Sequence, residues 1–220
     1  MVKYDNNVYK KDGVYMGSRI MHYCISSLIA DKLEIENRSE FMLGGIAPDI
    51  HGLMGIAKGV THFKDIDASG KSRINVMRFY DTYRNVIHEP FYLGYFCHLL
   101  SDVEWLDVYF KVVDYISHEQ WAEKLNVAYS DFGKLNGRII DHYSLQLHQH
   151  VVPIINIYNY NADFLPALID LLGNDFSNNE EIQAEPLALF NNDNSEIHDF
   201  INKSVTQCIH TLSNLGITRK

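Results

Sequence analysis

The fold is decided by residues 90–116, which read PFYLGYFCHLLSDVEWLDVYFKVVDYI. A proline suits the first turn of a helix, because its missing N–H would have no partner within the helix there. Aromatic residues recur from Phe91 to Phe110, and the helix that this stretch predicts is apolar on nearly every side. We therefore expect a central, buried helix.

Helical periodicity extends to the rest of the chain. Apolar residues recur every three or four positions in five further segments. These segments are 18–33, 73–87, 131–147, 162–172 and 194–215. Residues 41–52 (FMLGGIAPDIHG) contain glycines and a proline that break the period and predict a loop. No stretch alternates convincingly with a period of two, so the predicted fold class is all-α.

The composition is that of one globular domain. The chain has 220 residues, of which 46% are hydrophobic and 21% are charged, and such a chain can bury a core. We expect a single-domain helical bundle over residues 18–220, preceded by a polar, irregular N-terminal arm over residues 1–17. The formal net charge of −9 argues against binding duplex nucleic acid through its phosphates.

Three features predict a cytoplasmic protein. The cysteines, Cys24, Cys97 and Cys208, are odd in number and lack CxxC spacing, which fits a reducing compartment better than a disulfide framework. The first residues lack the apolar segment of a secretory signal. No apolar run approaches the roughly 20 residues needed to span a bilayer, so we expect no transmembrane segment.

The sharpest chemical feature is the pair His98 and Asp102 in FCHLLSD. The two residues are four apart on the helix expected to be buried, so their side chains project from one face. A buried carboxylate is costly unless it is paired or bound to a cation. A metal site and a His–Asp hydrogen bond within the core are equally good interpretations of this pair alone.

Three other residues are candidate ligands. Asp49 follows a proline in the glycine-rich stretch, where the backbone can bring a carboxylate close to a ligand. His62 lies between predicted helices, and His22 lies one step from the apolar stripe of the first helix. Each has an ordinary structural interpretation, as a turn aspartate, a surface histidine or a half-buried histidine. Together with the pair His98 and Asp102 they supply only imidazole and carboxylate groups, which suit zinc or a similar divalent ion.

The ordered set of motifs resembles the zinc-dependent phospholipase C family, whose superfamily includes the single-strand-specific zinc nucleases. The motifs are MH (21–22), GGIAPDI (44–50), THF (61–63), FCHLLSD (96–102) and YSDFGKLN (129–136). The resemblance covers roughly the first two thirds of the chain and rests on the order of the motifs.

This resemblance implies a helical fold with a cluster of divalent metals, usually zinc, between its helices. By position, Asp49, His62, His98 and Asp102 would hold one ion, and Asp102 would bridge to a second ion that His22 also binds. A bridging carboxylate can hold two cations about 3.5–4 Å apart, a separation suited to phosphoester hydrolysis.

Two departures from the family pattern affect the number of metals. The secreted enzymes use the terminal amino group and backbone of a tryptophan as a ligand, whereas here 21 residues precede His22, so a water or a carboxylate must complete that site. A third metal in the family uses a His-x-x-x-Glu pair, and the nearest match here is His142 with Gln146, whose amide is a poor ligand. We expect two zinc ions, with a third weak or absent.

Five residues could act on the substrate. Asp49 or Asp131 could accept a proton as general base. Asp131 could equally be a metal ligand or a helix N-cap. His51 could line the pocket, and Lys58 could bind a phosphate, as could Arg84, although most such charges are simply solvated.

The predicted function is phospholipase C-like, metal-dependent hydrolysis of a phosphoester, on either a small phosphoester or a phospholipid. Three alternatives stay open. The same fold could act as a phosphatase or nuclease on a soluble phosphoester or nucleotide. An HD-type phosphohydrolase is a second alternative, although the one His-Asp dipeptide, His198-Asp199, comes late in the chain. The third is a non-catalytic helical metal-binding or interaction protein. The oligomeric state cannot be predicted.

Overall fold

The computed structural model describes residues 18–66, 68, 72–113, 118–177 and 180–217. The expected N-terminal arm, residues 1–17, lies outside these ranges. The elements in chain order are α1 (Arg19–Lys32), α2 (Arg38–Gly44), the 3₁₀ turn η2 (Ala47–Ile50), α3 (His51–Met54), α4 (Lys58–Thr61), β1 (Lys64–Ile66), β2 (Ser72–Ile74), α5 (Val76–Thr82), α6 (Pro90–Val113), α7 (His118–Tyr143), η3 (Ala162–Phe164), α8 (Leu165–Phe176), α9 (Glu180–Ala184) and α10 (Ser195–Asn214). The all-α, single-domain prediction is confirmed.

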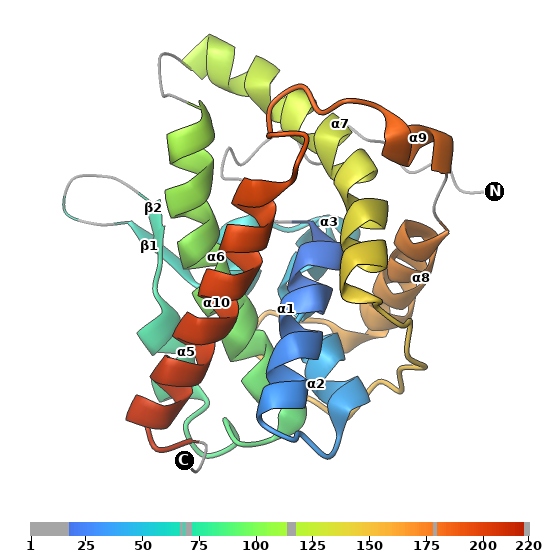
Figure 1. Cartoon of the computed structure of the whole chain (residues 1–220). Coiled ribbons are helices and arrows are strands. Elements are labelled where there is room, and N and C mark those ends of the chain that lie inside the picture. The colour runs from blue at the N-terminus through green and yellow to red at the C-terminus, as the bar shows by residue number, and fades with distance from the viewer. Residues whose placement is uncertain (1–17, 67, 69–71, 114–117, 178–179, 218–220) are drawn as a thin grey trace.

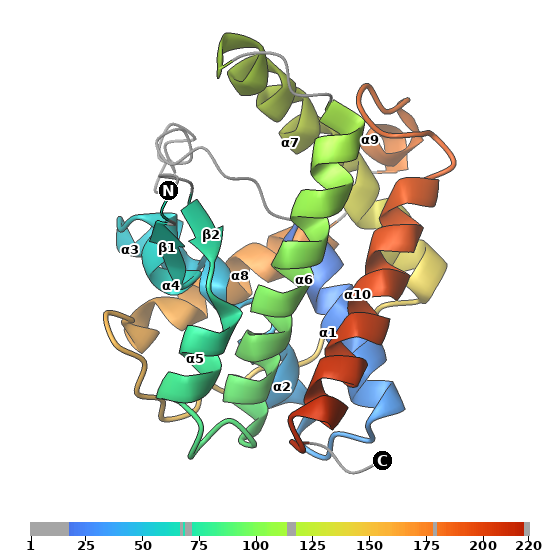
Figure 2. The ribbon, with the colours of Figure 1, turned by 90° about the vertical axis from the view of Figure 1, so that its left-hand side faces the viewer.

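Helix α6 is the central helix, as its apolar sequence predicts. It packs against α2, α5 and α10, and Figure 2 shows it between α5 and α10, whereas in Figure 1 its lower part lies behind α10. Its side chains from Phe91 to Leu99 are buried, whereas Val103 is 44% exposed. Among the described residues no helix is both long and apolar enough to cross a membrane.

Helix α1 begins where the sequence predicts, because Ser18 caps it. The Ser18 hydroxyl accepts a hydrogen bond from the Met21 N–H, which satisfies one of the free donors of the first turn. The helix packs against α2, α7 and α10, and every residue from Ile20 to Ala30 except Leu28 is buried. Its position brings His22 to face α6.

The prediction of a loop over residues 41–52 is wrong for most of the stretch. Residues 38–44 form α2, and residues 47–54 form η2 and α3. Gly44 and Gly94 permit a direct backbone contact between α2 and α6: a Cβ on Gly44 would lie 2.1 Å from the Phe91 carbonyl oxygen, and one on Gly94 would lie 2.0 Å from the Phe41 carbonyl oxygen. These glycines therefore serve close helix packing, which sequence alone does not distinguish from chain flexibility.

Two further helix boundaries differ from prediction. Helix α7 begins at His118 instead of 131, because no glycine or proline interrupts residues 118–130, and it ends at Tyr143, where Ser144 adopts a φ of 50°. The segment predicted as helix 73–87 is shorter, since α5 starts only after Asn75 caps it. The residues just before it pair in the small antiparallel hairpin β1–β2, with Lys64 opposite Ile74.

Candidate metal centre

Five side chains from separate elements converge between the helices. His22 comes from α1, Asp49 from η2, His62 from the residue that ends α4, and His98 and Asp102 from successive turns of α6. These residues form two overlapping groups whose potential ligand atoms lie within 4.8 Å of one another: His22, His98 and Asp102 in one, and Asp49, His62 and His98 in the other. All five metal ligands predicted from the sequence are thus brought together.

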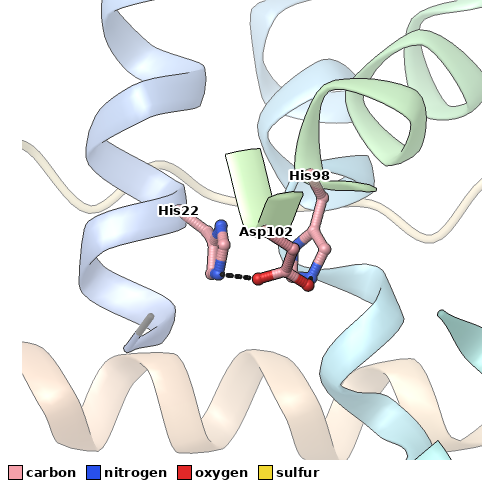
Figure 3. Close-up of side chains that lie close together, drawn as sticks. All are labelled: His22, His98 and Asp102. Atoms are coloured by element: carbon pink, nitrogen blue, oxygen red, sulfur yellow. Dashed lines mark ion pairs between the residues drawn. The ribbon is translucent and has the colours of Figure 1, made fainter. Parts of the chain in front are cut away.

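The carboxylate of Asp102 lies at the centre of this cluster. Its Oδ1 atom lies 3.2 Å from His22 Nε2, and its Oδ2 atom lies 3.2 Å from His98 Nε2 and 3.4 Å from His62 Nε2. The dashed line in Figure 3 marks the pairing of His22 with Asp102. The Nε2 atoms of His62 and His98 are 3.3 Å apart. The two oxygens of one carboxylate therefore face different histidines.

Two of the rings are oriented by backbone carbonyl groups. His98 Nδ1 donates to the Gly45 carbonyl oxygen at 2.8 Å, and His62 Nδ1 donates to the Lys58 carbonyl oxygen at 3.1 Å. A carbonyl oxygen only accepts, so in both rings the proton is on Nδ1. When neutral, each ring then presents the lone pair of Nε2 to Asp102.

The third ring is oriented by Ser101. The Ser101 hydroxyl donates its proton to the His98 carbonyl oxygen at 2.8 Å, and its oxygen lies 3.0 Å from His22 Nδ1. Because that proton is already donated, the hydroxyl accepts from His22 Nδ1–H. His22 therefore also presents an Nε2 lone pair, and no signal in the sequence identifies Ser101 beyond its place one residue before Asp102.

Burial and neighbouring charges set the ionisation of the cluster. Burial lowers the pKa of His22 and of His62, which favours the neutral form of both rings. Burial also acts to lower the pKa of His98, but the Asp102 charge outweighs it and the net shift is upward. Burial acts to raise the pKa values of both aspartates, but His98 and His22 at Asp102, and Lys58 and His62 at Asp49, outweigh it and lower them.

The cluster therefore contains more lone pairs on its ring nitrogens and carboxylate oxygens than N–H protons that could be donated to them. Even with His98 protonated, the neutral rings of His22 and His62 direct lone pairs at a fully buried carboxylate. With all three rings neutral and protonated on Nδ1, neither oxygen of Asp102 has a hydrogen-bond donor among the described residues. Buried charge without a donor is costly. A bound cation is the simplest way to satisfy all of these atoms, and the His–Asp hydrogen bond considered for His98 and Asp102 would satisfy only two of them.

Of the five side chains in this cluster, only that of Asp49 reaches solvent. The side chains of His22, His62, His98 and Asp102 are 0% exposed, whereas that of Asp49 is 11% exposed. On the side of Asp49, Lys58, the first residue of α4, places its Nζ atom 3.7 Å from Asp49 Oδ1.

His51 lies on the same side of the cluster. Its ring meets that of His62 edge to face, with the ring centroids 5.6 Å apart. Burial, followed by the charge of Lys58, lowers the pKa of His51 to about 4. The two residues predicted to bind substrate, Lys58 and His51, thus lie beside the cluster.

Asp131, the other candidate base, lies in neither group. It is buried in the middle of α7 instead of at a helix N-cap, and its oxygens accept backbone N–H bonds from Ala188 at 3.0 Å and from Leu189 at 2.7 Å. Lys134 lies 3.7 Å away on the same helix. These contacts give Asp131 a structural role, holding the segment before α10 against α7.

Asp131→Asn is therefore expected to lower stability and leave metal content unchanged. The amide would turn an NH₂ group toward backbone donors, which costs about 1–3 kcal/mol of unfolding free energy. Denaturant unfolding and elemental analysis of the same preparation measure both quantities. Loss of metal with unchanged stability would contradict this role and indicate that Asp131 is a metal ligand.

Other residues considered from the sequence do not join the cluster. The ring of His142 lies 4.1 Å from that of His198, centroid to centroid, and Gln146 is exposed, so the pair expected to be closest to a third metal site is not assembled with the other ligands. Arg84 pairs with Asp81. The His198-Asp199 dipeptide lies on α10 and belongs to neither group of potential ligands.

Comparison with known proteins adds no assignment to this geometry. The chain matches no protein-family model, no curated protein sequence and no solved structure.

Proposed function

We propose that this cluster binds two divalent cations, with zinc as the best-suited ion, and that the protein uses them to hydrolyse a phosphoester. The proposal is carried by one observation: three imidazole Nε2 atoms and both oxygens of Asp102 meet in a buried space with too few protons. Imidazole and carboxylate ligands are those that zinc accepts.

The orientation of Asp102 supports a pair of ions instead of one. Its Oδ1 faces His22 and its Oδ2 faces His62 and His98, as a carboxylate shared between two cations requires. The Nδ1 hydrogen bonds to carbonyl and hydroxyl oxygens correspond to the outer contacts that orient histidine ligands in metal sites. No third ion is proposed.

Bound divalent ions would supply positive charge for the phosphoryl oxygens and would lower the pKa of water. The remaining roles fall to the protein. The buried rings exclude bulk water from the inner side, and the partly exposed Asp49 meets an incoming substrate. Asp49 is the carboxylate proposed to accept a proton from the attacking water.

The substrate class rests on the sequence resemblance together with this site. A phospholipase C-like diesterase and a phosphatase on a soluble ester both fit it, and a reducing, cytoplasmic location stays a prediction. The described cysteines, Cys24, Cys97 and Cys208, are buried and free, which agrees with a reducing compartment.

Metal content and turnover test the proposal together. We expect about two zinc-like ions per chain by elemental mass spectrometry. Chelation should abolish hydrolysis of a panel of phosphomonoesters, phosphodiesters and short-chain phospholipids, and zinc should restore it. His142→Ala is the matched control, because this exposed histidine lies outside the cluster and its loss should change neither quantity.

Two results would contradict the proposal in different ways. A chain that holds no metal after zinc supplementation would make the cluster a polar core. A chain that holds metal but hydrolyses no ester in the panel would instead be a metal-binding or interaction module.

A further inference from the structure

Asp49 and Lys58 mark the side of the cluster that faces solvent, and we expect substrate to enter there. Both side chains keep a small exposed area, 11% for Asp49 and 12% for Lys58, while the other ligand side chains are sealed at 0%. A phosphate that approaches the proposed ions therefore passes the Lys58 ammonium group. The positive charge of Lys58 acts on the phosphate over a short distance, at a poorly hydrated position.

Lys58 cannot be a metal ligand. An ammonium group has three donors and no lone pair, so it is not a ligand. Its Nζ lies 3.7 Å from Asp49 Oδ1, which is an ion-pair distance but too long for a hydrogen bond. Among the residues that the structure describes, no acceptor is found within hydrogen-bonding distance of Nζ. The donors of Lys58 are free for a ligand on the open side.

We propose that Lys58 makes the site selective for phosphomonoesters, which are dianions, over phosphodiesters, which are monoanions. This inference rests on the proposed function and narrows its substrate class. With two divalent ions in place, Asp49 and Asp102 balance only part of their charge, and Lys58 adds one further positive charge at the entrance. A dianion matches that surplus better than a monoanion.

Size and charge can be separated with a matched pair of ligands. Phenylphosphonate is a dianion near pH 8, and methyl(phenyl)phosphinate is a monoanion of nearly the same shape. The carbon substituents of both are held by P–C bonds, which water does not cleave. Their dissociation constants for the zinc-loaded full chain, measured by titration calorimetry, report selectivity without turnover. Values of kcat/KM for phenyl phosphate and methyl phenyl phosphate report it during hydrolysis.

We expect the wild-type protein to prefer the dianion by about tenfold or more, because one unit charge near an ammonium group about 4 Å away contributes at least this much at a partly buried site. Lys58→Gln should remove most of that preference by weakening dianion binding and leaving the monoanion nearly unaffected. Lys58→Arg should retain it. Lys32→Gln is the charge-matched control, since Lys32 is exposed in the last turn of α1.

The outcomes separate this inference from the proposed function. Elemental analysis must show that Lys58→Gln keeps its metal. If wild type is active and Lys58→Gln weakens both ligands equally, or neither, Lys58 only balances the charge of Asp49 and the inference is wrong. If wild type holds no metal or hydrolyses neither ester, the proposed function fails and the inference fails with it.

Discussion

Asp102→Asn is expected to give a folded protein that has lost most of its metal and more than about 100-fold of its phosphoester turnover. Residues that merely orient metal ligands typically contribute 10- to 100-fold to metal affinity or activity, and Asp102 is proposed to contact both ions directly. The amide of the variant would carry one acceptor oxygen and no charge, so it could not bridge two cations. Elemental mass spectrometry and kcat/KM for the best ester measure the two losses.

Without metal, Asp102→Asn should be more stable to heat than wild type, which is the reverse of the order expected with zinc bound. In chelator, the amide introduced by Asp102→Asn would donate a hydrogen bond to an Nε2 lone pair. The carboxylate of the wild-type protein cannot do so, because it has no proton to donate. We expect the melting temperature of the variant in chelator to exceed that of wild type by a few degrees, which corresponds to about 1 kcal/mol for a chain of this size. In zinc, wild type should be the more stable, because a ligand that binds the folded state stabilises it.

Asp199→Asn is the control for Asp102→Asn. Asp199 is exposed on α10, outside the cluster, and its substitution should change neither metal content nor melting temperature. A lower melting temperature for Asp102→Asn in chelator as well as in zinc would identify His98 and Asp102 as a hydrogen-bonded core pair. Loss of metal in the Asp199 variant would favour the HD-type alternative.

The second large effect is expected from Gly94→Ala. The added Cβ would lie 2.0 Å from the Phe41 carbonyl oxygen and 2.9 Å from the Gly45 backbone nitrogen. Backbone atoms cannot rotate away, so α2 would have to move from α6. We expect a loss of about 3 kcal/mol or more of unfolding free energy, at the upper end for a single added methyl group in a packed interior.

Metal binding should weaken in the same variant. The Gly45 carbonyl accepts from His98 Nδ1, so a displaced α2 loosens the orientation of that ring. Denaturant unfolding and zinc titration measure the two effects. Gly133→Ala in α7 is the matched control, because nothing lies within 4 Å of its added Cβ, and a helical glycine replaced by alanine gains about 0.5–1 kcal/mol. Equal stability of both variants would show that α2 and α6 do not touch at this point.

Sequence patterns predict three of the long helices well, but they miss the first half of α7 and predict the short helices poorly. The apolar density of residues 90–116 identified α6, and the periodicity of 18–33 and 194–215 identified α1 and α10. The error at residues 41–52 has a physical origin. Glycine breaks helical periodicity in sequence, yet Gly44 lies within α2 because a larger residue would not fit against α6.

In the candidate site, the proximity of residues close in sequence could be predicted, whereas contacts between residues far apart in sequence could not. His98 and Asp102 share a helix face, so their spacing is sufficient to place them together. Asp131 could not be interpreted in this way, because the backbone donors that occupy it belong to residues 188–190, nearly 60 positions later in the chain. The Gly45 carbonyl was also missed, since a backbone contact leaves no trace in residue type.

The five candidate ligands are synthesised before the last helix of the bundle. All five candidate ligands lie between His22 and Asp102, whereas α10, which packs against both α1 and α6, is made last among the described helices. During synthesis all five candidate ligands leave the ribosome before α10, which packs against the two helices that carry His22, His98 and Asp102, has been made. The proposed ions could therefore bind before α10 packs onto these helices. In that case the metal supply during translation would influence how much of the protein is loaded.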